Sequence, residues 1–399
     1  MITLKPLRVT IPLATACGIA LLLQTAAAAA DANKHGWNGR TFHVNCDKGR
    51  RLSHVLKRTQ PGDTIRLRGT CRERVRIETH ELTIVGIDGP TIDGSGTKAD
   101  AKHPGLLTVV GSHGLRIENL RVQNGPANGI AVQPGSQVIL SGISARRNAG
   151  TGFTFDNAQA GIENIDSAKN GFGGIDAFTN STIIASGRIA AIDNAGPGIE
   201  MNAASVLELR GAAVTASNNG GDGVLLVSGS LLTVLSFEQS QGSSVTADGN
   251  GGNGMTVATS SVNVVGSQFF GSAANRFTLT NNMNGIFVPS GAINNPFGTA
   301  RFIASNNVDS GITVIDGGSI LAVGGLELTA NRVGLIADAA GALTLVSLPP
   351  NPSVIDGNGV DVSLSFGTRA TFSGVQLTTI DCDETVLSRG STVCPPAAP

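Results

Sequence analysis

The chain has 399 residues, a formal net charge of −1 and charged side chains at only 14% of its positions, which excludes a strongly basic or strongly acidic protein. It contains 53 Gly, one Trp and no Tyr. This composition excludes a bundle of amphipathic helices and indicates short strands joined by many turns.

Residues 1–30 have the pattern of a secretory signal peptide. Lys5 and Arg8 precede an apolar run, and a series of alanines ends just before Asp31. We expect cleavage there and a secreted, periplasmic or cell-surface location, with lipoprotein processing at Cys17 as the alternative. No later stretch is apolar enough to span a membrane. An exported chain of pI about 6.6 is not expected to bind nucleic acid.

Residues 31–74 are expected to form an N-terminal cap. Cys46 and Cys71 flank this segment, and in an exported chain the simplest pairing is a local disulfide. Leu52 and Leu56 have helical spacing and predict a short amphipathic helix. The segment 31–80 is basic, which favours binding of an acidic glycan or a membrane surface at this end. Alternatively, these charges only form a solvated face.

A repeat runs through residues 75–375. Glycines recur 22 to 31 residues apart, each followed by an apolar or β-branched residue, and Asn stands four residues earlier at seven of the ten sites. The glycines are Gly129, Gly152, Gly174, Gly198, Gly223, Gly254, Gly285, Gly311, Gly334 and Gly359. The asparagines are Asn148, Asn170, Asn194, Asn219, Asn250, Asn281 and Asn307.

A period of this length predicts a stack of similar coils. Each unit is too short for two helices and shows strand alternation, so equivalent strands are expected to pair in parallel about 4.8 Å apart. Gly would serve where the chain turns with a positive φ or passes close to its neighbour, and the Asn amides would bond from coil to coil. We predict one all-β solenoid of about twelve coils.

The "N-x-x-x-G-Φ-x-Φ" coils and the entry segment "PGDTIRLRGTCRERVRIETHELTIVGIDGPTIDG" resemble the right-handed parallel β-helix proteins with a pectin-lyase-like fold. The resemblance implies that fold, and the enzymes of the group are lyases, hydrolases and epimerases of acidic polysaccharides. Their signatures are missing here: the chain has no Gly-His-Gly and no Asp-Asp pair, and all six His lie between His35 and His113.

Three carboxylates are expected to face outward on neighbouring coils. Asp176 and Glu200 both stand two residues after a repeat glycine, so strand alternation places them outside the core and in register. Asp156 stands four residues after its glycine, diagonal to Asp176. Such a set is able to hold Ca²⁺, although no cofactor is required by the sequence. Alternatively, the acids only keep an outer sheet face soluble.

Arg147 and Lys169 occupy equivalent positions before the Asn turns. With a metal on the acids, either one would serve as base in a uronate lyase or epimerase. Asp176 and Glu200 would otherwise act as acid and nucleophile in glycoside cleavage, where a separation of about 5 Å suits retention.

Residues 376–399 are expected to close the last coil through a Cys382–Cys394 disulfide. Three functions remain open: a monomeric exported protein that binds a polysaccharide or other cell-surface polymer, a uronate lyase or epimerase, and a structural spacer. The chain has no Tyr, and no Lys after Lys169, and this favours binding over catalysis. Phe287 is the one Phe expected at an outward slot.

Overall fold

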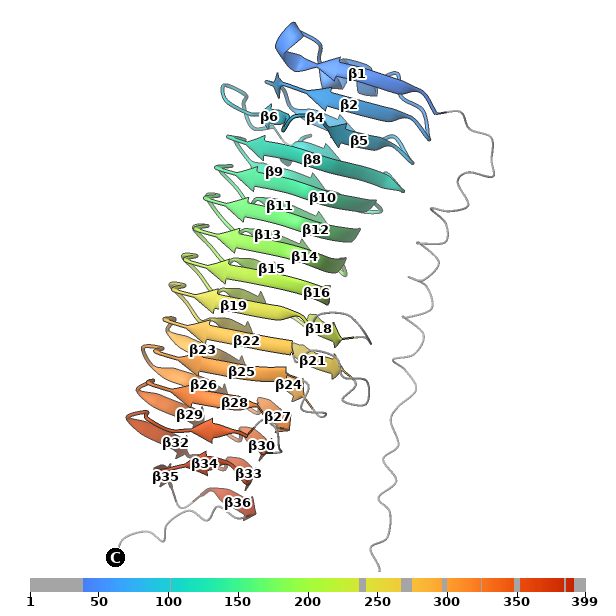
Figure 1. The fold of residues 1–399 in the computed structure, drawn as a ribbon. Helices are drawn as coiled ribbons and strands as arrows, with labels where there is room; N and C mark the ends of the chain where they lie inside the picture. The colour runs from blue at the N-terminus through green and yellow to red at the C-terminus, as the bar shows by residue number, and fades with distance from the viewer. Residues whose placement is uncertain are drawn as a thin grey trace, which may run out of the picture. The chain divides into compact units, whose positions relative to one another are not determined.

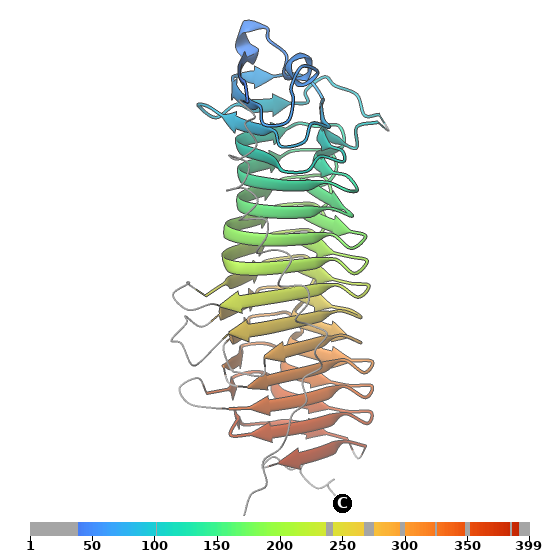
Figure 2. The same ribbon diagram turned by 90° about the vertical axis from the view of Figure 1, so that its right-hand side faces the viewer.

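Short parallel strands follow one another along the chain and stack coil upon coil (Figure 1). The computed structural model describes residues 39–100, 102–236, 242–266, 275–295, 300–323, 325–347, 352–383 and 385–390. Figure 2 shows the same coils from the side. The predicted right-handed parallel β-solenoid is confirmed.

One sheet has 13 strands, one from each coil, against the predicted dozen. Its strands are β4 (Val75–Ile77), β7 (Gly105–Val109), β9 (Asn128–Val132), β11 (Phe153–Asp156), β13 (Ile175–Phe178), β15 (Ile199–Met201), β17 (Val224–Leu226), β20 (Met255–Val257), β23 (Asn284–Pro289), β26 (Ser310–Ile315), β29 (Val333–Ala337), β32 (Val360–Leu364) and β35 (Ile380–Cys382).

The second sheet has 23 strands and wraps the rest of each coil. Its strands are β1 (Thr41–Asn45), β2 (Thr64–Arg68), β3 (Thr70–Cys71), β5 (Thr83–Gly86), β6 (Thr91–Asp93), β8 (Leu115–Gln123), β10 (Gln137–Arg146), β12 (Gln159–Ala168), β14 (Thr182–Ile192), β16 (Val206–Ser217), β18 (Leu231–Ser236), β19 (Ser244–Asp248), β21 (Ser261–Gly266), β22 (Asn275–Thr280), β24 (Ala292–Asn295), β25 (Ala300–Ser305), β27 (Ser319–Val323), β28 (Leu326–Thr329), β30 (Ala342–Val346), β31 (Val354–Ile355), β33 (Arg369–Ser373), β34 (Gln376–Leu377) and β36 (Leu387–Gly390).

The core is a narrow apolar column between the two sheets. The first and third residues after nine of the ten repeat glycines point into it, as in β13, where Ile175 and Ala177 are buried. Because every coil repeats this alternation, the buried side chains form one continuous cluster along the stack.

Nine of the ten repeat glycines form a row in which no side chain fits. A Cβ at Gly198 would lie 2.6 Å from the carbonyl oxygen of Gly223, one coil away, and the other eight meet the next coil in the same way. None of the nine has a positive φ, so close approach between coils is the reason for glycine here.

The predicted place of Gly359 in this row is wrong. Val333 pairs with Val360 and Leu335 with Val362, so Asp361 takes the row position opposite Gly334. The Asp361 N–H donates to the Thr379 hydroxyl, and the Asp361 carboxylate accepts the Thr379 N–H. In the coil of β32, the row position therefore falls two residues later than the sequence repeat implies.

An asparagine ladder runs beside the glycine row, as predicted. Asn148 Nδ2 donates to Asn170 Oδ1 at 3.0 Å, and the Asn148 backbone N–H donates to the same oxygen at 3.1 Å. The ladder comprises Asn148, Asn170, Asn194, Asn219, Asn250, Asn282, Asn307, Asn331 and Asn358. Asn281 was predicted in place of Asn282. Asn281 has a left-handed φ of 56° and immediately precedes the ladder residue Asn282.

Replacing Asn219 by Ala is expected to cost about 2–4 kcal/mol of unfolding free energy. It leaves the buried Asn194 N–H without an acceptor and removes one of the two acceptors of Asn194 Nδ2. Chemical denaturation measures this loss. Asn263→Ala is the control: that amide accepts one bond, from Asn294, on the half-buried outer face. Equal losses in the two variants would contradict a structural role for the ladder.

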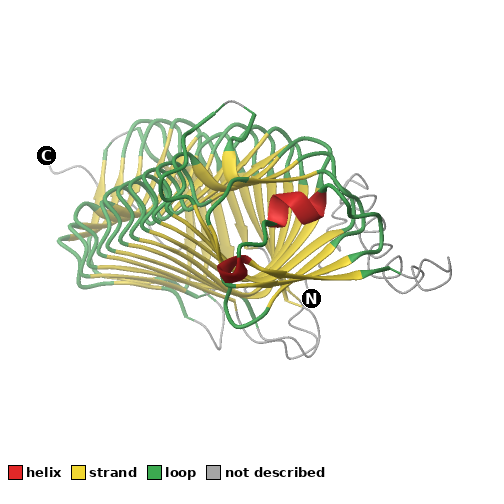
Figure 3. Cartoon of the chain, turned by 90° about the horizontal axis from the view of Figure 1, so that it is seen from above, coloured by secondary structure: helices red, strands yellow, loops and turns green. Residues whose placement is uncertain are grey.

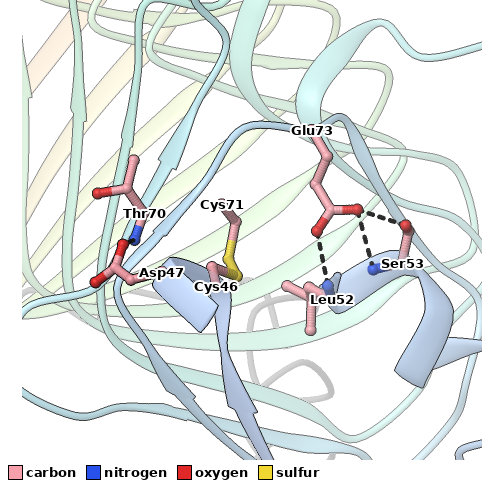
Figure 4. The surroundings of a disulfide bond; sticks show 7 residues. All are labelled: Cys46, Asp47, Leu52, Ser53, Thr70, Cys71 and Glu73. Carbon is pink, nitrogen blue, oxygen red and sulfur yellow. Dashed lines mark hydrogen bonds between the residues drawn. A yellow bond between two sulfur atoms is a disulfide. The ribbon is translucent and has the colours of Figure 1, made fainter. Parts of the chain in front are cut away.

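The N-terminal segment holds the predicted Cys46–Cys71 disulfide (Figure 4). The 3-10 helix η3 (Cys46–Lys48) and the helix α2 (Leu52–Leu56) flank it, and Leu52 and Leu56 are buried. Glu73 accepts hydrogen bonds from the backbone N–H groups of Leu52 and Ser53, at 2.7 and 3.3 Å. α2 lies close to β1 and β4, and the view from above shows the two short helices in red (Figure 3). That α2 caps the first coil stays a prediction.

The parallel stack extends beyond the predicted limits of 75–375. β1 and β2 pair in parallel before it, and β33 pairs with β36 after it. Cys382 is disulfide-bonded, and Cys394, its predicted partner, lies outside the described residues, as does the predicted signal peptide at 1–30. Among the described residues, no helix is long and apolar enough to cross a membrane.

Candidate functional site

Asp176 and Glu200 lie side by side on the outer face of the 13-stranded sheet. β13 pairs in parallel with β15, and Asp176 is the register partner of Glu200. On the other side of β13, Asp176 is the partner of Thr154 in β11. The predicted register of the two acids is therefore confirmed, and strand alternation places both outside the apolar column.

Asp176 is nevertheless buried, with only 1% of its surface exposed. The turn before β13 passes over it, since a Cβ on Gly173 would overlap Asp176 Oδ1. Thr151, in the equivalent turn of the preceding coil, donates its hydroxyl to Asp176 Oδ2 at 2.6 Å. Asp176 Oδ1 is buried without a hydrogen-bond partner among the described residues.

The pKa of Asp176 is raised to about 7, chiefly by burial; the hydrogen bond from Thr151 opposes the rise, and the neighbouring Glu200 carboxylate adds to it. Burial also raises the pKa of Glu200, against the bond that Asn202 Nδ2 donates to its Oε1 at 3.3 Å. Near neutral pH, a protonated carboxyl thus stands beside a second carboxyl group. Pairs of this kind supply the acid and the base or nucleophile of many hydrolytic sites.

The predicted cations do not join these acids. Arg147 and Lys169 are exposed at equivalent positions, with left-handed φ values of 53° and 57°. Among the described residues, no salt bridge or hydrogen bond links either cation to Asp176 or Glu200. The predicted role of Lys169 or Arg147 as base therefore has no contact to support it.

The predicted three-carboxylate calcium site does not fit the arrangement of the side chains. Asp156 stands at the end of β11, opposite Phe178 and hence diagonal to Asp176, as predicted, but it does not join the other two acids in a compact ligand set. Among the described residues, the one group of three candidate ligands within 4.8 Å is Cys46, Cys71 and Glu73, which contains the disulfide. We therefore assign no step to Ca²⁺.

Phe178 and Asn202 belong to the site although the sequence interpretation missed them. Phe178 is half-buried on the outer face, in line with Asp156, and Asn202 holds Glu200. Their signal was present, because both stand two residues beyond an acid on the same strand alternation. Phe287, the predicted outward aromatic, is half-buried on β23.

Residues 86–238 match a protein family described as a right handed beta helix region. No curated protein matches the sequence. The A-module of the mannuronan C-5 epimerase AlgE6 from Azotobacter vinelandii is 15% identical over 94% of this chain and 95% of its own, with a TM-score of 0.44. An alginate lyase from Paenibacillus sp. str. FPU-7 is 12% identical over 87% and 99%, with a TM-score of 0.34. The catalytic domain of a GH87 α-1,3-glucanase in complex with nigerose is 11% identical over 90% and 69%, with a TM-score of 0.41.

Proposed function

We propose that this right-handed parallel β-helix protein binds a polysaccharide along the outer face of the 13-stranded sheet, at Glu200 and Phe178 and over the buried Asp176. The observation that carries the proposal is the buried, proton-holding Asp176 in register with Glu200. An unpaired buried carboxyl oxygen is costly to fold, and such groups are usual at functional sites.

The chemistry of the neighbouring side chains suits a sugar. Phe178 offers an apolar ring face, while Glu200 and Asn202 offer an acceptor and a donor for hydroxyl groups. Strands repeat about every 4.8 Å along the stack, and solenoids characteristically use such extended faces for long ligands. A polymer is therefore better matched to this face than a compact ligand.

Glycoside cleavage is the second candidate, and the raised pKa of Asp176 is the observation that favours it. For this reaction the turn at Gly173 would have to uncover Asp176, which would then donate its proton to the leaving oxygen, while Glu200 would act from the neighbouring strand as nucleophile or base. A uronate lyase or epimerase instead needs a base at the α-carbon, and in the described part of the chain neither Lys169 nor Arg147 forms a hydrogen bond or salt bridge with the pair.

A panel of alginate, pectate and glycosaminoglycans tests both candidates. We expect wild type to bind at least one polymer, and Glu200→Gln to weaken that binding about tenfold through loss of a charged acceptor. Glu208→Gln is the control, because Glu208 lies on β16 of the other sheet, beside Arg210. Release of reducing ends or of unsaturated uronates would identify an enzyme. No binding to any polymer would contradict the proposal and leave a spacer.

We also propose export to the periplasm, cell surface or medium, in keeping with the Cys46–Cys71 disulfide, and action as a monomer. Calcium serves as a separate check. We expect millimolar Ca²⁺ to leave the melting temperature unchanged, because the acids do not converge on one point. A rise that Asp176→Asn with Glu200→Gln abolishes would restore the calcium site.

A further inference from the structure

A pocket of about 330 Å³ opens on the outer face of the 13-stranded sheet, near its N-terminal end. Its lining residues are Arg76, Lys102, His103, Pro104, Val110 and Gln133. Arg76 extends from β4, and Lys102, His103 and Pro104 come from the loop between β6 and β7. Two cationic side chains and an imidazole thus meet at one cavity.

The loop is fixed by arginines beneath it. Arg74 donates to the Lys98 carbonyl at 2.5 Å and to Asp100 Oδ2 at 2.9 Å. Arg76 Nη1 donates to the Lys102 carbonyl at 3.0 Å. These bonds hold the backbone of the pocket wall in place, so the cavity is preformed.

The acids near the pocket are already engaged. Asp100 faces His103 Nδ1 at 3.0 Å and accepts the backbone N–H of Lys102 at 2.8 Å, and the bond with His103 lowers the pKa of Asp100. Glu78 accepts from Arg76 Nε at 2.7 Å. Within the described chain, no hydrogen bond or salt bridge engages the Lys102 ammonium group. The wall therefore presents uncompensated positive charge to the cavity.

We propose that this pocket binds the carboxylate or sulfate group of an acidic ligand, with Lys102 and Arg76 as its cationic partners. Guanidinium and ammonium groups are the strongest donors to such anions. The free edge of the His103 ring and the Gln133 amide add further hydrogen-bonding groups.

The pocket lies in line with the proposed polysaccharide site. Gln133 follows β9, and its position is continued by Asp156 on β11 and Phe178 on β13, because Val132 pairs with Phe155 and Asp156 with Phe178. Two strand spacings, about 10 Å, separate Gln133 from Phe178. One extended chain would reach both places. This step rests on the proposed function and narrows its ligand to an acidic polysaccharide.

The test compares an acidic oligosaccharide with its carboxyl-reduced counterpart by calorimetry, on wild type, Lys102→Gln and Lys98→Gln. Lys98 is the matched control, since it is exposed in the same loop and does not line the pocket. We expect wild type and Lys98→Gln to prefer the acidic sugar about tenfold, and Lys102→Gln to lose most of that preference. A preference that survives in Lys102→Gln would overturn the proposal.

Free sulfate and acetate form the second arm, followed by the NMR resonances of the pocket. If they perturb these resonances in wild type but not in Lys102→Gln, while no oligosaccharide binds, the anion pocket stands and the polysaccharide function fails. If neutral and acidic sugars bind equally and free anions cause no change, the polysaccharide function stands and the anion pocket is refuted.

Discussion

Asp176→Asn is expected to raise the free energy of unfolding above pH 7 by up to about 4 kcal/mol, and to change it little near pH 4. The folded chain holds the Asp176 proton up to about pH 7, whereas an unfolded Asp releases it near 3.8. Wild type therefore loses stability as the pH rises between these values. Asn cannot ionise, and it keeps an oxygen to accept the Thr151 hydroxyl.

Denaturant unfolding of wild type and variant at pH 4 and pH 8 measures this difference. Glu208→Gln is the control on the other sheet, and its effect is expected to be small at both values. Stabilisation of Asp176→Asn at pH 8 combined with weaker polysaccharide binding would identify a group kept at the expense of stability for function. Destabilisation at pH 8 would show that Asp176 is ionised and satisfied in the folded chain.

Gly198→Ala is expected to cost more than about 4 kcal/mol or to prevent folding. The new Cβ would lie 2.6 Å from Gly223 O and 2.7 Å from Asn219 Nδ2. Neither atom is able to move aside, because the Gly223 oxygen accepts the Ile199 N–H at 3.0 Å and the Asn219 amide belongs to the ladder. A shift of one coil would break bonds on both of its sides.

Gly161→Ala is the matched control. Gly161 lies within β12, has no positive φ, and its new Cβ would meet only Ile139 Cγ1, at 3.7 Å. We expect its stability to stay within about 1 kcal/mol of wild type, or to rise, because Ala restricts the unfolded chain. Similar melting temperatures for Gly198→Ala and Gly161→Ala would contradict the close-approach explanation of the row.

The periodic features of this fold were predictable from sequence, because one strand spacing forces the same choice on every coil. Glycine beside asparagine predicted the row and the ladder, and hence the pairing of Asp176 with Glu200. The prediction failed where a turn changes length without changing composition. In "DGNGVDV" the glycine pattern persists while Asn358 and Asp361 carry the actual register.

The site was harder to predict than the fold. Alternation places a residue outside the core, but it does not reveal what covers it, so the burial of Asp176 under the turn at Gly173 had no signal in the spacing. Arg147 and Lys169 stand at equivalent positions in the repeat, but this does not reveal whether their side chains point toward the acids. Phe178 could have been found by following the same alternation one step further along β13.

On the proposed function, the outer face of the 13-stranded sheet binds a polysaccharide. Hydrogen–deuterium exchange with and without a binding oligosaccharide tests it most directly, since it locates the ligand without any substitution. We expect added protection in β11, β13 and β15 and in the turns around Thr151 and Gly173. Protection confined to the 23-stranded sheet, or none at a saturating concentration of the oligosaccharide, would contradict the account.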